Sequence, residues 1–184
     1  GRHRSRPIEQ VLDQSRSLLD GGFKEVILTG VHIGEYGTDL DVDITLTDVL
    51  KDLVAIRRIP RLRLSSIWPT AITDAMIEMM ADPSNPLCRY LHLAVQHGHD
   101  EILDLMKRTY TTGMVENLLT KLANLMPDIG LGTDIMVGFP GETDAHFNAM
   151  YSWLESMPFS YLHVFSYSRR DKTVAAKFPG QVHP

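Results

Sequence analysis

The stretch DIMVGFPGET, residues 134–143, joins a continuous apolar run to a turn rich in glycine and proline. Short apolar runs that end in such residues are typical of buried strands, and Thr143 is a suitable cap for a following helix. The stretch therefore predicts a strand, a rigid turn and a helix. The residues leave two interpretations of the turn open. It is either a tight connection only, or a place where bare backbone and Glu142 meet a ligand.

The rest of the chain repeats this alternation of strand and helix. Apolar residues at helical spacing predict helices over residues 8–19, 46–56, 73–80, 101–106, 114–126 and 143–157. Short apolar or alternating runs predict strands over residues 25–29, 61–67, 90–95, 129–137 and 159–165. The second helix begins behind either Thr45 or Thr47. The order is one helix, then four strand-helix units, then a final strand, which favours parallel strands with right-handed crossovers.

Composition narrows the class of protein. The 184 residues are 43% hydrophobic, which is enough for one sizeable core, so we expect one domain. The formal charge is −5, so any anionic partner must be bound through local basic patches. No apolar run approaches the roughly 20 residues of a membrane helix, and the basic N-terminus lacks the apolar stretch of a signal peptide. We expect a soluble, cytoplasmic protein with no membrane partner.

The series opens on a helix, so the strand that would precede it is missing from this sequence. Five parallel strands alone would leave an exposed edge, which natural proteins avoid. The sequence therefore predicts an α/β fold in which residues 1–184 are a fragment of a larger, partial (β/α) TIM-like barrel.

Unusual polar residues follow each predicted strand, whereas the opposite strand ends are plainer. Since the carboxyl ends of parallel strands meet at one edge, the sequence predicts a ligand site there. The residues are Thr29, Gly30, His32, Glu35 and Tyr36 after the first strand, Ser65, Ser66 and Trp68 after the second, Gln96, His97 and His99 after the third, Gly138–Glu142 after the fourth, and Tyr167–Arg170 with Thr173 after the fifth.

Metal ligation and phosphate binding are separate questions. The single cysteine, Cys88, can hold neither a disulfide nor a thiolate metal site alone, and His97 and His99 lack the spacing of a zinc motif. We expect surface or hydrogen-bonding histidines and no metal ligands in this chain. Three basic groups favour phosphate contacts over solvated charge: Arg2, Arg4 and Arg6; Arg57, Arg58, Arg61 and Arg63; and Arg169, Arg170 and Lys172.

Seven motifs in one order resemble a known family. They are GRHRSRP (1–7), LTGVHIGEYG (28–37), RLRLSS (61–66), LHLAVQ (91–96), MKRTY (106–110), GTDIMVGFPGET (132–143) and HVFSYSRRDKT (163–173). Together they resemble the radical S-adenosylmethionine (SAM) methylthiotransferases, almost from end to end. This resemblance implies a tRNA modification enzyme with SAM and 4Fe-4S clusters as cofactors, an electron donor, and the tRNA anticodon region as partner.

The resemblance also implies a mechanism and explains the missing strand. Family members carry a CxxxCxxC motif on the first strand and its loop, whose thiolates hold a cluster that cleaves SAM to a deoxyadenosyl radical. That radical abstracts hydrogen from the carbon to be thiolated. An N-terminal cluster domain and a C-terminal RNA-binding barrel complete such enzymes. This chain lacks the motif, so the fragment alone is expected to be inactive.

Matching positions imply site residues. Those expected to line the SAM cleft are Thr29, Gly30, Ser65, Gln96, Asp134, Gly138, Pro140, Gly141 and Glu142. Those expected near the substrate are Tyr36, Tyr167, Ser168 and Arg170. One departure is His97, because the family commonly has Gln-Ser-Gly where this chain has Gln96-His97-Gly98.

The loop of residues 29–37 most resembles the enzymes that methylthiolate threonylcarbamoyladenosine beside the anticodon. Alternatives that stay open are methylthiotransferases acting on isopentenyladenosine tRNA or a ribosomal protein. A non-catalytic ligand-binding or RNA-binding α/β domain is a further alternative.

Overall fold

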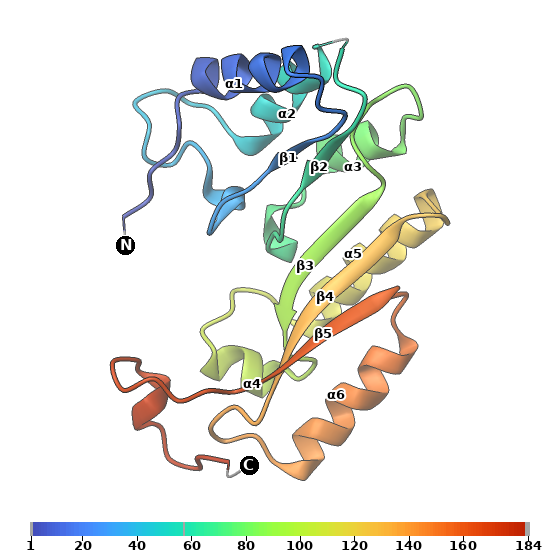
Figure 1. The fold of residues 1–184 in the computed structure, drawn as a ribbon. Coiled ribbons are helices and arrows are strands. Elements are labelled where there is room, and N and C mark those ends of the chain that lie inside the picture. The colour runs from blue at the N-terminus through green and yellow to red at the C-terminus, as the bar shows by residue number, and fades with distance from the viewer. Residues whose placement is uncertain (1, 57, 183–184) are drawn as a thin grey trace. The chain divides into compact units, whose positions relative to one another are not determined.

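The computed structural model describes residues 2–56 and 58–182, shown as a ribbon in Figure 1. The chain divides into two compact units, of which one ends at Leu91 and the other begins at His92. Each unit is described by itself below. No described helix combines the length and apolar character that crossing a membrane requires.

The first unit contains a two-stranded parallel sheet. Its elements are α1 (Ile8–Asp20), β1 (Val26–Leu28), the 3-10 helix η1 (Ile33–Glu35), α2 (Leu46–Val54), β2 (Leu62–Leu64), the 3-10 helix η2 (Pro69–Ala71) and α3 (Asp74–Ala81). In the sheet, Leu28 of β1 lies opposite Leu64 of β2. The strands therefore end side by side, and the residues that follow them leave from the same edge.

Helix α2 shows how local chemistry sets an element boundary. The Thr45 side chain accepts a hydrogen bond from the Asp48 backbone N–H, and the Asp48 carboxylate accepts one from the Thr45 N–H. This reciprocal capping box satisfies two N–H groups that a helix start leaves without partners. Thr45 is therefore the cap, and Thr47 is buried with its hydroxyl 3.0 Å from that of Thr73.

The second unit is built on a three-stranded sheet of order β3-β4-β5. Its elements are β3 (Tyr90–Gln96), α4 (Asp100–Leu105), α5 (Thr112–Leu125), β4 (Gly130–Val137), α6 (Asp144–Ser156), β5 (Tyr161–Ser166) and the 3-10 helix η3 (Ala175–Lys177). Strands β4 and β5 are parallel, with Asp134 opposite His163.

Alternation along the strands separates two faces of this sheet. Leu91, Leu93 and Val95 of β3 are fully buried, as are Val115, Leu119 and Leu122 of helix α5. The intervening side chains of β3 include His92 and Gln96. One face of the sheet is thus apolar core, and the other carries polar side chains.

The predicted order of elements is confirmed. The α/β fold class is also confirmed, because helices alternate with strands, the pairs β1-β2 and β4-β5 are parallel, and the sheets are open. Two strands are shorter than predicted. Residues 25–29 form only Val26–Leu28, and residues 61–67 form only Leu62–Leu64. Glu25, which directly precedes β1, forms ion pairs with Arg61, which directly precedes β2, and with Arg63 inside β2. That 1–184 is one piece of a barrel domain stays a prediction.

Candidate functional site

The carboxyl ends of β1 and β2 bring together three of the predicted site residues. Thr29 and Gly30 follow β1, and Ser65 directly follows β2 with its N–H donating to the Leu28 carbonyl at 2.9 Å. The Ser65 Oγ atom is buried and has no hydrogen-bond partner among the described residues. A buried hydroxyl without a partner costs free energy, so this atom is a candidate ligand contact.

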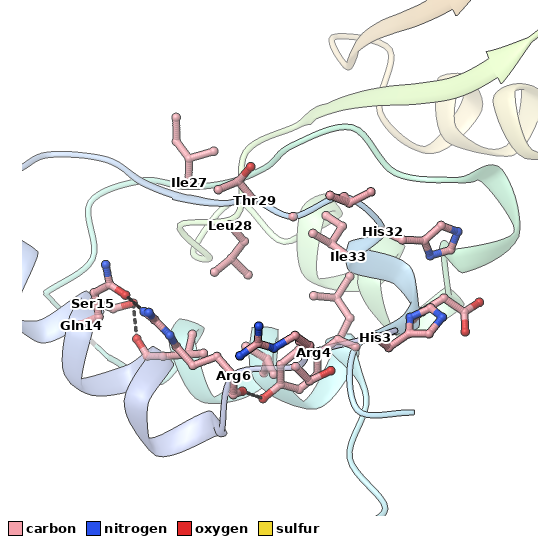
Figure 2. Close-up of a pocket in the computed structure, with 18 of the residues that line it drawn as sticks. His3, Arg4, Arg6, Gln14, Ser15, Ile27, Leu28, Thr29, His32 and Ile33 are labelled. Carbon is pink, nitrogen blue, oxygen red and sulfur yellow. Dashed lines mark hydrogen bonds between the residues drawn. The ribbon is translucent and has the colours of Figure 1, made fainter. Parts of the chain in front are cut away.

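A cavity of about 710 Å³ lies beside the end of β1, which is within the size range of small-molecule sites. Figure 2 shows its surroundings: Ile27, Leu28 and Thr29 on one side, and Arg4 and Arg6 of the N-terminal segment on the other. Its lining also includes Arg2, His3, Ser5, Gly30, His32, Glu35 and Tyr36. The cavity thus has apolar side chains on one side and arginines on the other. This lining suits a ligand with both an apolar body and an anionic group.

Three hydrogen bonds hold the N-terminal segment against the loop after β1. The Ser5 N–H donates to the Asp39 carboxylate at 2.9 Å, and the Gly37 N–H donates to the Ser5 hydroxyl at 3.0 Å. The Tyr36 hydroxyl donates to the Arg6 carbonyl at 2.7 Å. Tyr36, predicted to contact substrate, thus lines the cavity while its hydroxyl positions the basic segment.

His32 lines the cavity; the sequence analysis placed it at the edge where the strands end, but not among the SAM or substrate contacts. Its Nδ1 atom is buried without a hydrogen-bond partner among the described residues, and its ring packs edge-on against Trp68 with centroids 4.3 Å apart. A ring held by an indole with an unsatisfied nitrogen beside a cavity is a candidate ligand contact. Its place after a strand was the available signal.

The predicted turn after β4 is built around its own glutamate. Gly138 and Gly141 have positive φ angles of 74° and 91°, which glycine adopts without strain. The Phe139 N–H donates to the Glu142 Oε2 atom at 3.0 Å, and the Gly141 N–H donates to the Gly180 carbonyl at 2.9 Å. These groups have internal partners, so the contacts observed here are those of a tight turn. Direct contact of Gly138, Pro140, Gly141 or Glu142 with a cofactor stays a prediction.

The Glu142 carboxylate is also 3.6 Å from Nε2 of the fully buried His97. Burial raises the pKa of Glu142, but the neighbouring His97 and the N–H groups of Phe139 and Gly138 outweigh it and hold the pKa below its usual value of 4.5. A carboxyl whose pKa is lower in the folded state stabilises the fold above its unfolded pKa. That contribution is lost as the pH falls through the folded pKa.

Replacing Glu142 with glutamine is expected to lower the free energy of unfolding by about 1 to 2 kcal/mol at pH 7, because the turn N–H groups lose a charged acceptor. The loss should shrink as the pH falls below 4.5, where the wild-type carboxyl takes up its proton. Urea denaturation at pH 7 and pH 4 measures both values. Glu101→Gln is the control, since its exposed pair with His146 should contribute less than about 1 kcal/mol. Equal losses at both pH values would contradict this account.

Gln96 and His97 form the turn after β3. Gln96 has a positive φ of 73°, which is strained for a residue with a side chain. The His97 Nδ1 atom accepts a hydrogen bond from the His99 N–H at 3.0 Å, and His99 in turn caps helix α4. Both histidines therefore hold the backbone, as the sequence predicted. Strain at a strand end is typical of functional turns, and contact of Gln96 with a cofactor stays a prediction.

The residues after β5 differ in burial. The Tyr167 N–H continues the ladder to the Val137 carbonyl at 2.8 Å, and its ring packs against Phe139. The Tyr167 hydroxyl is buried without a partner among the described residues, which makes it a further candidate ligand contact. Ser168 and Arg170 are exposed beyond it, and their predicted substrate contacts are not tested by their surroundings.

Asp134 lies between two imidazoles on the polar face of the second sheet. Its Oδ1 atom is 2.9 Å from His92 Nε2 and 3.3 Å from His163 Nδ1. The sequence analysis expected Asp134 to face SAM and did not connect it with these histidines. The structure thus places Thr29, Gly30 and Ser65 together in one unit, and Gln96, Gly138 and Tyr167 at strand ends of the other.

The described arginines of the second predicted phosphate-binding group form ion pairs with acidic side chains. Arg58 pairs with Asp20 at 2.7 Å, and Arg61 and Arg63 pair with Glu25. Arg57 lies outside the described residues. The N-terminal group, which lines the cavity, is the better candidate for an anionic ligand.

Comparison with known proteins shows what this chain is similar to. Threonylcarbamoyladenosine tRNA methylthiotransferase of Bacillus subtilis is 39% identical over 97% of the chain. Ribosomal protein uS12 methylthiotransferase of Citrifermentans bemidjiense is 38% identical over 99%, and tRNA-2-methylthio-N(6)-dimethylallyladenosine synthase of a Thermoanaerobacter strain is 40% identical over 99%. The chain spans only 38 to 40% of the length of these relatives.

Solved structures support the fold. The radical S-adenosylmethionine methyltransferase TsrM of Kitasatospora setae, with cobalamin and a 4Fe-4S cluster bound, superposes with a TM-score of 0.72 at 19% identity, over 90% of this chain and 30% of that one. The archaeal Elp3 of Methanocaldococcus infernus gives a TM-score of 0.52 at 17% identity, over 91% of this chain and 43% of that one. Residues 1–154 match the Radical SAM superfamily. The chain therefore belongs to the radical SAM superfamily, within which its curated relatives are methylthiotransferases.

Proposed function

We propose that this chain is the catalytic core of a methylthiotransferase that uses SAM and a 4Fe-4S cluster to methylthiolate threonylcarbamoyladenosine next to the tRNA anticodon. The observation that carries the reaction class is the similarity to methylthiotransferases over nearly the whole chain. The choice of threonylcarbamoyladenosine rests on the resemblance of the loop after β1, because identity to the three kinds of relative is similar at 38 to 40%.

Three buried polar atoms without partners among the described residues support a SAM-binding role. They are Ser65 Oγ and His32 Nδ1 in the first unit and Tyr167 Oη in the second. SAM offers an ammonium, a carboxylate, ribose hydroxyls and an adenine edge, which these atoms could hydrogen-bond. Thr29 and Gly30 of the first unit, and the turn residues Gly138–Glu142 of the second, are proposed as further SAM contacts. SAM supplies the methyl group and the radical precursor when bound.

The residues of this chain do not fit the iron-sulfur cluster. Cys88 is the only cysteine of the sequence, whereas such clusters are held by several thiolates. Burial raises the pKa of the Cys88 thiol, which opposes the thiolate form that ligates iron. We therefore assign the cluster ligands, and contact with an electron donor, to other parts of the full-length protein.

The cationic side of the cavity supports an anionic partner. Arg2, His3, Arg4 and Arg6 line it, although the whole chain carries a net charge of −5. Concentrated positive charge in an acidic protein is suited to phosphate groups of RNA. A cytoplasmic location, where tRNA is modified, belongs to this proposal.

Mass spectrometry of tRNA nucleosides from a strain that lacks the gene tests the proposal. We expect the methylthiolated form of threonylcarbamoyladenosine to disappear and to return with the wild-type gene. Loss of the methylthiolated dimethylallyladenosine would instead assign the second tRNA substrate. An intact pool of methylthiolated nucleosides together with an unmodified ribosomal protein uS12 would instead assign the protein substrate. This substrate is a candidate because the chain is 38% identical to a uS12 methylthiotransferase.

Replacing Ser65 with alanine in the full-length protein is expected to weaken SAM binding about 5- to 30-fold, since one hydrogen bond to a polar ligand is worth about 1 to 2 kcal/mol. Fold stability should stay equal or rise slightly, because the substitution removes a buried hydroxyl without a partner. Calorimetric titration and thermal unfolding measure the two quantities. Ser66→Ala is the matched control, as its neighbouring side chain is exposed. Unchanged SAM affinity in Ser65→Ala would remove Ser65 from the cleft.

A further inference from the structure

We propose that His92, Asp134 and His163 bind a divalent transition-metal ion, for which Co²⁺ and Zn²⁺ are the probes. The three residues come from the adjacent strands β3, β4 and β5. One ligand atom from each lies within 4.8 Å of the other two. Two imidazole nitrogens and one carboxylate oxygen form a ligand set that first-row metals favour.

The spacing of the ligand atoms is close to that of a metal site. Zinc binds imidazole nitrogen and carboxylate oxygen at about 2.0 to 2.2 Å, so neighbouring ligands in a tetrahedral site lie about 3.3 Å apart. The Asp134 Oδ1 atom is 2.9 Å from His92 Nε2 and 3.3 Å from His163 Nδ1. These two distances are close to that spacing, and the three ligand atoms lie within 4.8 Å of one another.

Tyr161 orients the first histidine from behind. Its hydroxyl lies 2.9 Å from His92 Nδ1, so this nitrogen can donate to the hydroxyl while Nε2 keeps a free lone pair for the metal. A glycine makes this contact possible. A Cβ atom on Gly132 would lie 2.1 Å from the Tyr161 ring, so the ring crosses β4 only because Gly132 has no side chain.

Burial leaves the proposed ion accessible from one side. The His92 and Asp134 side chains are 10% and 23% exposed, whereas His163 is 56% exposed. Three protein ligands with an open position are typical of metal sites that keep a water or a substrate group. The cation would also balance the partly buried carboxylate of Asp134.

A second cluster of the same composition serves as the internal comparison. His99, Glu101 and His146 also bring three ligand atoms within 4.8 Å. Here, however, His99 Nδ1 accepts the Glu101 N–H and His146 Nδ1 accepts the Thr143 N–H, each at 3.3 Å. Nδ1 is then unprotonated, so Nε2 carries the proton in each neutral ring and is not free to bind a metal. The tautomers therefore favour the first cluster.

The same three residues could also form a hydrogen-bonded chain without an ion, in which His92 and His163 both donate to Asp134. Titration of the metal-free 184-residue chain with Co²⁺ separates the two arrangements. We expect visible absorption bands of tetrahedral Co²⁺ at one equivalent, which added Zn²⁺ abolishes. The readout is independent of SAM chemistry, so the proposed function and this inference can fail separately.

Variants assign the site. His163→Gln and Asp134→Asn should each weaken Co²⁺ and Zn²⁺ affinity at least tenfold, and Zn²⁺ should raise the melting temperature of the wild type more than that of either variant. His146→Gln is the matched control and should leave affinity unchanged. Circular dichroism confirms folding, and exposed His163 is the substitution least able to disturb it. No saturable binding, or binding lost with His146→Gln and kept in His163→Gln, would overturn the proposal.

Discussion

Replacing Gly37 with alanine is expected to lower the free energy of unfolding by about 3 to 5 kcal/mol. Gly37 has a φ of 92°, which is strained for alanine, and an added Cβ would lie 1.8 Å from the Ile44 carbonyl oxygen. Since that neighbour is backbone, the clash cannot be relieved by a side-chain rotation. The loop must shift, and the hydrogen bond from the Gly37 N–H to Ser5 should be lost with it.

Urea denaturation of the purified chain measures this loss. Gly22→Ala is the matched control, because Gly22 has a similar φ of 86° but open space where the Cβ would be. It should cost only about 1 to 2 kcal/mol, the backbone penalty alone. If the two variants lose equal stability, the clash with the Ile44 carbonyl contributes nothing, and this explanation for glycine at position 37 is wrong.

Replacing Gly132 with alanine should cost about 3 kcal/mol, because the new methyl group would overlap the Tyr161 ring in a packed sheet. The displaced ring should also lose its contact with His92. Thermal and urea unfolding measure the stability. Gly113→Ala, at an uncrowded position in helix α5, should stabilise the chain by up to about 1 kcal/mol.

A double-mutant cycle isolates the contact. In a Tyr161→Ala background the ring is absent, so Gly132→Ala should cost less than about 1 kcal/mol. Additive losses in the double variant would show that Gly132 does not act through Tyr161.

Local signals in the sequence were sufficient for the order of elements. Helices are specified by apolar periodicity and by capping residues, both of which involve contacts between residues only a few positions apart. Three of these caps are Thr73, Thr111 and Thr143. Strand lengths were less predictable. Glu25 and Arg63 fit an alternating pattern, but they pair with each other across the sheet, and this depends on which strands become neighbours.

The candidate site also combines features that could be predicted from the sequence with features that could not. The positions of Thr29, Gly30 and Ser65 after parallel strands followed from the sequence, because strand ends in such sheets share an edge. The inward position of the Glu142 carboxylate did not, since it depends on the buried His97 of another turn. That Thr29, Ser65, Gln96 and Glu142 share one rim stays a prediction, because these residues belong to two units.

By itself, the sequence determined the alternation of strands and helices, the caps, the family and the single cysteine, all of which are written in residue identity and short-range spacing. Only the tertiary structure decided that His92, Asp134 and His163 converge and that Tyr161 reaches His92 across Gly132. The physical reason is strand register, which brings together side chains 29 to 71 positions apart in the sequence. No local pattern encodes that register.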